Sequence, residues 1–270
     1  MDTNFKCNRR SWLVGGMTAV ACLSLNVSAF AQVVGVNDAI NKAGRQRMLS
    51  QRMTKAWLAT GQGVDPSRAE RIMSESMSLF DRQLVELKAY APNSEIKATY
   101  ANLDAVWSDY KAILVGHAPE RSAAIDLLAL DANVLKLSHQ GTIQMERYSG
   151  QSVGRLVNLA GRQRMLSQRT AKFYLSKSWG VSVPDQLKEL DAARREFVQA
   201  LQVLKDAPEA TDVIRQELEL AQQQWVFFDN ALANAKEASS ASQHAKEVFT
   251  TSENILKVMD RVTSLYSKLA

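Results

Sequence analysis

Ten consecutive residues occur twice in this chain, and this repeat constrains the fold more than any other feature. The segment Ala43–Arg52 reads Ala-Gly-Arg-Gln-Arg-Met-Leu-Ser-Gln-Arg, and the same ten residues return at Ala160–Arg169, 117 positions later. The similarity extends beyond this motif, through Phe80 and Phe197, Leu84 and Leu201, Trp107 and Trp225, and the segments 133–136 and 254–257. A repeat with so long a period indicates two duplicated domains rather than a solenoid of short units.

The hydrophobic pattern of each copy predicts four helices. Apolar residues recur with helical spacing, strand-type alternation is absent, and the few prolines and glycines gather between the apolar stretches. The expected helices span about 36–60, 66–90, 94–115 and 120–148 in the first copy and about 153–178, 184–206, 209–236 and 241–269 in the second. We therefore expect an all-α fold of two tandem up-and-down four-helix bundles, with one module at 32–148 and the other at 149–270.

The junction between the copies, Ser149–Gly154, allows two arrangements. A turn there would fold the modules side by side, whereas a continuous helix would place them end to end. Its two glycines cost a helix roughly 2 kcal/mol relative to alanine. This cost favours a break without excluding the continuous helix.

The first thirty-one residues have the layout of an export signal. Basic residues precede a short apolar stretch, Trp12–Val27, and a small-x-small cleavage site follows at 29–31. Two variants remain open: Arg9-Arg10 loosely resembles a twin-arginine signal, and Cys22 offers a lipidation site. The apolar stretch is short and broken by glycines, which disfavours an uncleaved anchor. We expect cleavage after Ala31 and a soluble periplasmic protein.

Composition excludes several classes of function once the signal is removed. Both cysteines, Cys7 and Cys22, lie inside the signal, so the mature chain has no disulfide or thiolate chemistry. Removal of the signal also lowers the formal net charge from +5 to +3. A nucleic-acid-binding protein requires a concentrated basic face, and neither this charge nor an exported destination predicts one.

The repeated motif has two different faces when it is placed on a helix. Leu49, Met53 and Ala56 form the stripe expected to enter the core of their own bundle. Arg47 lies on another face, where residues spaced by three and four form a heptad-like seam for a second helix. The seam consists of Ile40, Gly44, Arg47, Gln51, Thr54 and Leu58, and in the other copy of Val157, Gly161, Arg164, Gln168, Ala171 and Leu175.

The centre of this seam has the chemistry of an anion site. An ordinary helix–helix seam carries leucine or isoleucine, whereas this one carries glycine, arginine and glutamine. Glycine lets two backbones approach closely, and arginine offers a fixed fork of donors suited to oxyanions. Two such helices face to face would bury two guanidinium groups, and an anion between them is the natural counter-charge. The alternative is that these arginines lie on a solvated face.

No catalytic, metal or cofactor site is predicted. His117, His139 and His244 are scattered, without partners at metal-ligand spacing. Trp107 and Trp225 occupy equivalent positions and are interpreted as core anchors. No phosphate-binding loop, nucleophile elbow or triad order is visible, so we expect no enzymatic activity.

The motif resembles the signature of the PilJ-type domain, the periplasmic N-terminal module of type IV pili methyl-accepting chemotaxis transducers. Over Ile40–Gly44 it is also similar to the related sensor domain of the nitrate/nitrite kinase NarX. The resemblance implies a four-helix bundle that pairs through its first helix. In nitrate-sensing members it implies an anion held by one arginine from each partner, and the matching arginines here are Arg47 and Arg164.

Two departures from the family pattern affect the expected function. Lys42 has no basic counterpart, because the equivalent residue is Leu159, so any site should be asymmetric. Family members are normally flanked by membrane helices and followed by signalling domains, and we expect neither in this protein. We therefore expect it to act through a separate membrane receptor, kinase or transporter.

Two functions are consistent with these observations. The first is an exported binding protein that holds a small inorganic anion, nitrate or nitrite, between the two modules. The second is an interaction module without a small ligand, which pairs with a PilJ-type receptor or with itself as a homodimer. The candidate ligand-binding residues are Arg47, Arg164, Gln51, Gln168, Gly44 and Gly161, with Lys42, Arg45, Arg52, Arg162 and Arg169 as secondary candidates.

Overall fold

The computed structural model describes residues 32–181, 184–233 and 241–269, and this part of the chain is helical without strands. The expected export signal, residues 1–31, lies outside the described residues. No helix in the described ranges is both long and apolar enough to cross a membrane. The helices are α1 Val36–Gly61, α2 Pro66–Tyr90, α3 Ser94–Gly116, α4 Arg121–Ser149, α5 Ser152–Ser178, α6 Gln186–Asp206, α7 Asp212–Ala233 and α8 Ala241–Ser267. The all-α fold of two tandem four-helix bundles is confirmed.

Local sequence signals explain where several of these helices begin and end. Pro66 begins α2, where its fixed φ suits a first turn and its missing N–H is no loss. Asn93 caps α3, because its side chain accepts a hydrogen bond from the backbone N–H of Ile96 at 2.9 Å. Gly150 ends α4 in the left-handed conformation, with φ 61°. The junction is therefore a turn between Ser149 and Ser152 rather than a continuous helix.

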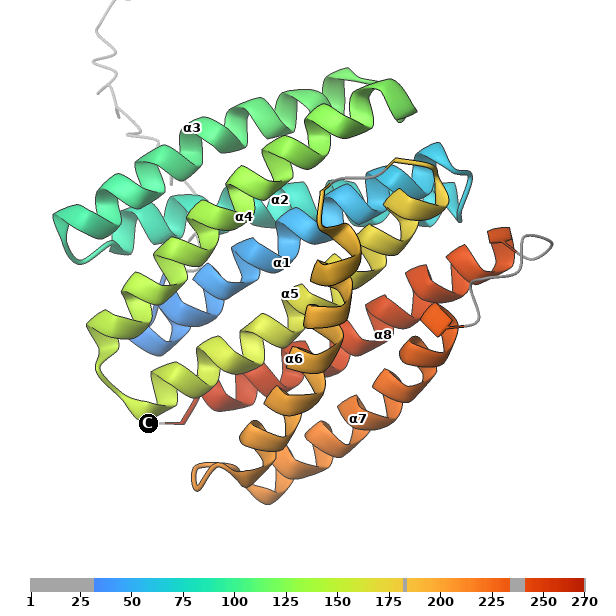
Figure 1. Ribbon diagram of the computed structural model, residues 1–270. Coiled ribbons are helices and arrows are strands. Elements are labelled where there is room, and N and C mark those ends of the chain that lie inside the picture. Colours follow the sequence, from blue (N-terminus) through green and yellow to red (C-terminus); the bar gives the residue numbers. More distant parts are fainter. Residues whose placement is uncertain (1–31, 182–183, 234–240, 270) are drawn as a thin grey trace, which may run out of the picture.

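The turn folds the two modules side by side, so that the two motif helices pack against each other. Figure 1 shows α1 and α5 adjacent in the middle of the molecule. Within the first module α1 also packs against α2 and α4, and within the second α5 packs against α6 and α8. Helices α3 and α7 lie farther out, against α4 and α8 respectively. The end-to-end alternative is thus wrong, and one chain contains a pseudo-twofold pair of modules.

Each module has its own aromatic anchor at an equivalent position. Phe80 stacks on Trp107 with ring centroids 4.1 Å apart, and Phe197 stacks on Trp225 at the same distance. Both tryptophans are buried, as the interpretation of core anchors requires. These offset aromatic pairs hold the second helix of each module to the third, which keeps the motif helix in the centre.

Candidate functional site

The two seams predicted from helical spacing are buried against each other between α1 and α5. All twelve seam residues are buried, including the two guanidinium groups, which have no exposed surface. Arg47 donates from Nη2 to Oδ1 of Asn158 at 2.7 Å, and Arg164 donates from Nη2 to Oδ1 of Asn41 at 2.9 Å. Each arginine thus crosses from its own module to the other. The alternative that these two arginines lie on a solvated helix face is therefore wrong.

The two glycines of the motif let the guanidinium groups meet at the contact between the helices. A Cβ added to Gly44 would lie 3.1 Å from Nη2 of Arg47 and 3.7 Å from Nη2 of Arg164. A Cβ added to Gly161 would lie 3.1 Å from Nη2 of Arg164 and 3.8 Å from Nη2 of Arg47. Both donors therefore sit beside the same pair of glycines, where any side chain would displace them.

The two arginines differ in the side chain that contacts Nη1. For Arg164 this side chain comes from α8, and for Arg47 it comes from α4. Arg164 donates from Nη1 to Oδ1 of Asp260 on α8 at 2.5 Å, which forms an ion pair. Arg47 donates from Nη1 to Nδ1 of His139 on α4 at 3.2 Å. The internal alignment makes His139 the counterpart of Asp260, because 133–136 matches 254–257. Among the described residues no carboxylate lies within ion-pair distance of Arg47.

This difference shows in the protonation of the groups. Burial lowers the pKa of Arg47 to about 9. The charges of Arg162 and Arg164 act in the same direction, and the more distant carboxylates of Glu146 and Glu196 act in the opposite direction. Burial lowers the pKa of Arg164 to about 10, although the nearby Asp260 carboxylate acts in the opposite direction. Burial, with Arg47 beside it, lowers the pKa of His139 to about 4. His139 is therefore a neutral acceptor near pH 7, and Arg47 is a buried cation without an acid.

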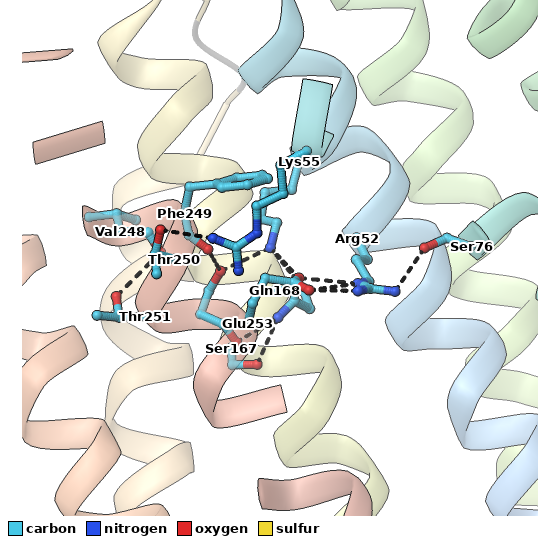
Figure 2. A network of polar contacts seen from close by, with 12 residues as sticks. Arg52, Lys55, Ser76, Ser167, Gln168, Val248, Phe249, Thr250, Thr251 and Glu253 are labelled. Atoms are coloured by element: carbon cyan, nitrogen blue, oxygen red, sulfur yellow. Dashed lines mark hydrogen bonds and ion pairs between the residues drawn. The ribbon is translucent and has the colours of Figure 1, made fainter. Parts of the chain in front are cut away.

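The predicted glutamines lie outside the arginine contacts, in a second polar layer. Gln168 accepts from Nζ of the fully buried Lys55 at 2.6 Å, and Lys55 also pairs with Glu253 at 2.7 Å (Figure 2). Gln51 donates to Oδ1 of Asp131 at 2.7 Å. Each glutamine thus has a structural partner, although Oε1 of Gln51 is buried without a hydrogen-bond partner. Their role in binding an anion stays a prediction.

The same layer links the modules through two lysines that the sequence analysis did not single out. Lys55 of α1 reaches Glu253 of α8, and Lys172 of α5 reaches Oδ2 of Asp131 on α4 at 2.5 Å. The lysines are visible as an equivalent pair in the repeat, but their acids are not at equivalent positions. Asn41 and Asn158 were also visible only as a matched pair. For these two lysines and two asparagines, the match between the two copies was the signal that could have identified them as site residues.

Each of the secondary candidates is ion-paired with an acid, and one of them shares its acid with the arginine pair. Arg45 pairs with Asp260 at 2.9 Å and thereby shares this carboxylate with Arg164. Its neighbours one turn or more away pair elsewhere. These pairs are Lys42 with Asp38 and Glu86, Arg52 with Glu253, Arg162 with Glu196, and Arg169 with Glu189.

The histidines and carboxylates of the site do not form a metal centre. Within the described ranges, no three histidine, cysteine or acidic side chains are placed to hold a metal ion. The charged side chains that α1 and α5 place at their contact are arginines and lysines, and such cationic donors attract anions rather than cations. The arrangement therefore defines a helical module pair with a buried, cationic interface.

A comparison with protein families identifies this class of module. The type IV pili methyl-accepting chemotaxis transducer N-terminal domain, PilJ, matches the chain twice, over residues 29–134 and 149–251. The chain belongs to this family, whose domains are signalling-related and sensory rather than catalytic. No curated protein and no solved structure gives a significant match. The relation to the NarX sensor domain stays a prediction.

Proposed function

We propose that this protein is an exported sensor-type binding protein that holds a small oxyanion of the nitrate or nitrite class at the Arg47–Arg164 pair. The bound state is passed to a separate membrane receptor, kinase or transporter. The observation that carries the proposal is the buried guanidinium of Arg47, which meets Arg164 across Gly44 and has no carboxylate partner among the described residues. A buried cation without a counter-charge is unfavourable, and an anion removes this cost.

The broken symmetry makes Arg47 the primary contact in this proposal. Arg164 already has the carboxylate of Asp260, whereas Arg47 has only the neutral imidazole of His139 on its Nη1. The Nε atoms of both arginines are buried without a hydrogen-bond partner, so the difference between them lies at Nη1. A planar oxyanion can accept two parallel hydrogen bonds from a guanidinium edge. We therefore expect the anion on Arg47, with Arg164 adding long-range attraction.

The alternative function, pairing of a motif seam with another chain, receives less support from the geometry. Both seams are buried against each other within one chain, and ion pairs between α1 and α8 cross the same interface. A receptor or a second copy would need another surface, or would need the modules to separate. Pull-down of a PilJ-type receptor in the absence of any anion would revive this alternative.

The proposal is tested by the thermal stability of residues 32–270 with nitrate, nitrite, sulfate, phosphate and chloride at constant ionic strength. A ligand at a hundred times its dissociation constant adds about 2.7 kcal/mol of stability. We expect a shift with nitrate or nitrite that disappears in Arg47→Gln and persists in Arg71→Gln, which replaces an exposed arginine. Equal shifts with every anion, or a shift that Arg47→Gln retains, would contradict the proposal.

A further inference from the structure

A cavity of about 670 Å³ lies beside Arg47, between α4 and the second module. Its apolar wall includes Leu128, Ala132, Leu135, Met165 and Phe173. Arginine and lysine side chains at its edge come from both modules. We call this cavity the α4–α5 groove; it combines an apolar body with a cationic end.

The pseudo-twofold partner of this groove is closed by the chain's own side chains. On α8 the positions equivalent to Leu128, Ala132 and His139 are Phe249, Glu253 and Asp260. Figure 2 shows Phe249 beside Lys55, and Glu253 in contact with both Lys55 and Arg52. The Nζ atom of Lys55 lies 4.7 Å from the centroid of the Phe249 ring. Glu253 binds both cations, and Asp260 binds Arg164. On this side the protein supplies a phenyl ring and two carboxylates.

The α4 side carries Leu128, Ala132 and His139 at these three positions, but it supplies two of the groups from elsewhere. Lys172 pairs with the carboxylate of Asp131, and its Nζ lies 4.5 Å from the centroid of the Phe173 ring. The carboxylate of Asp260 has no such replacement, because Arg47 contacts His139 instead. Arg162 and Arg169 bind Glu196 and Glu189 on α6, so Arg47 is the one arginine of the groove lining without an ion-paired acid among the described residues. The comparison of the two sides thus indicates a missing carboxylate on Arg47, next to an apolar wall.

We propose that the α4–α5 groove binds an amphipathic monocarboxylate, whose carboxylate takes the position of the His139 imidazole on Arg47 and whose apolar body lies along α4 and α5. This inference rests on the proposed function, because it uses Arg47 as the anion contact. A carboxylate presents a planar pair of oxygens, as nitrate does, so the same guanidinium edge accepts either. The groove adds preference for an apolar tail.

His139 occupies the proposed head-group position. Arg47 has no exposed surface, and its Nη1 contacts the imidazole of His139, whose half-buried side chain lines the groove together with Arg47. A carboxylate that displaces the imidazole gains a coulombic attraction to Arg47 that a neutral ring does not supply. The contact between Asp260 and Arg164 is the chain's own example of this bond. The proposal therefore requires the imidazole of His139 to leave Nη1 of Arg47 when the carboxylate binds.

The test is calorimetric titration of residues 32–270 with acetate, butanoate, hexanoate and octanoate, with 1-octanol as the uncharged probe. Each CH₂ buried in the groove should tighten binding about three- to fourfold. Octanol should bind at least about tenfold more weakly than octanoate, because it lacks the charge. Equal affinities for acetate and octanoate, or equal affinities for octanol and octanoate, would overturn the proposal.

Two variants separate the head-group position from the apolar body. Ala132 is exposed on α4 and lines the groove, so Ala132→Phe should fill it. We expect octanoate to bind at least about tenfold more weakly, on the order of one buried aromatic contact. Nitrate binding should stay unchanged. Ala101→Phe, at an exposed alanine of α3, is the matched control. His139→Asp recreates the closed side and should abolish octanoate binding. If both variants still bind octanoate with the affinity of the wild type, the proposal that the groove binds it is wrong.

The failure of this inference is distinguishable from the failure of the proposed function. If nitrate binds through Arg47 and octanoate binds no better than acetate, the small-anion function stands and the groove inference fails. If octanoate binds equally well to the wild type and to Arg47→Gln, the arginine is not the anion contact and both fail. If Ala132→Phe abolishes the binding of octanoate but not of nitrate, the small-anion function and the groove inference are both supported.

Discussion

Arg47 and Arg164 lie in identical sequence motifs, but their surroundings differ. Replacing each of them should therefore affect the stability of the protein differently. Both are fully buried, and both donate to an asparagine of the other module. Only Arg164 has a carboxylate, because α8 carries Asp260 where α4 carries His139. Removing one partner of a charge pair leaves the other uncompensated, whereas removing a buried charge without a partner relieves its desolvation cost.

We therefore predict that Arg164→Met destabilises the protein by about 2 kcal/mol more than Arg47→Met, the scale of a hydrogen bond to a charged group. The difference stays near this value because the Asp260 side chain is 45% exposed and keeps its contact with Arg45. Urea unfolding of the two variants at pH 7 measures it. Equal losses, or a larger loss in Arg47→Met, would show that the two arginines are electrostatically equivalent.

At the scale of elements, the contact between α1 and α8 depends on a buried acid shared by two cations. Glu253 pairs with Lys55 at 2.7 Å and with Arg52 at 2.6 Å, and its side chain is 4% exposed. Burial alone would raise the pKa of Glu253, but Lys55 and Arg52 outweigh burial and lower the pKa to about 2. Burial lowers the pKa of Lys55 to about 8 despite this partner.

The depressed pKa of Glu253 predicts a specific loss of stability in acid. The unfolded carboxyl takes up a proton near its ordinary pKa of 4.5, and the folded one does so only near 2. The contribution of Glu253 is therefore complete above about pH 4.5 and is lost as the pH falls toward 2. Urea unfolding at pH 5 and pH 3 should show a smaller pH dependence in Glu253→Gln than in the wild type.

The same variant should be unstable at neutral pH. Glu253→Gln leaves the ammonium of Lys55 buried without its acid, which costs about 3–5 kcal/mol. Glu70→Gln, at an exposed glutamate of α2, should change little and serves as the control. If Glu253→Gln behaves like this control, the buried pair does not stabilise the contact between α1 and α8.

Helix positions were predictable from the sequence because their signals are local. Proline, glycine and apolar spacing gave the described helix ends to within three residues. The seam on α1 was equally predictable, because helical period alone places Gly44 and Arg47 on one face. The turn at Gly150 was not, since two glycines weaken a helix without dictating the left-handed conformation that ends it.

The partners of the motif side chains could not be predicted from the sequence, and the reason is physical. Asp260, His139 and Glu253 lie on helices far along the chain, and their contacts depend on how the modules face each other. His139 was interpreted as a scattered histidine, because the repeat does not show which counterpart faces which arginine. Only the packed structure shows that Arg164 contacts a carboxylate and Arg47 an imidazole.

At the scale of the whole molecule, the two modules are expected to unfold as one unit. Charged pairs between α1 and α8 and between α5 and α4 cross the interface, and the paired motif helices bury both seams. Separation of the modules would expose these groups without their partners. The modules are therefore coupled by their interface rather than only by the turn at Gly150.

We predict a single calorimetric transition for residues 32–270, with the calorimetric enthalpy equal to the van't Hoff enthalpy. Arg47→Met should preserve this single transition. Glu253→Gln should lower its midpoint without dividing it, because the seams stay in contact. Two resolved transitions in the wild type would show that the modules are thermodynamically independent.

We propose that this duplicated module has one closed and one open anion position, at Arg164 and Arg47. Calorimetric titration with nitrate distinguishes them, because the stoichiometry counts the positions that bind an anion. We predict one nitrate per chain in the wild type and none in His139→Asp, where an internal carboxylate would neutralise Arg47 as Asp260 neutralises Arg164. Two nitrates per chain, none in the wild type, or unchanged binding in His139→Asp would contradict the claim.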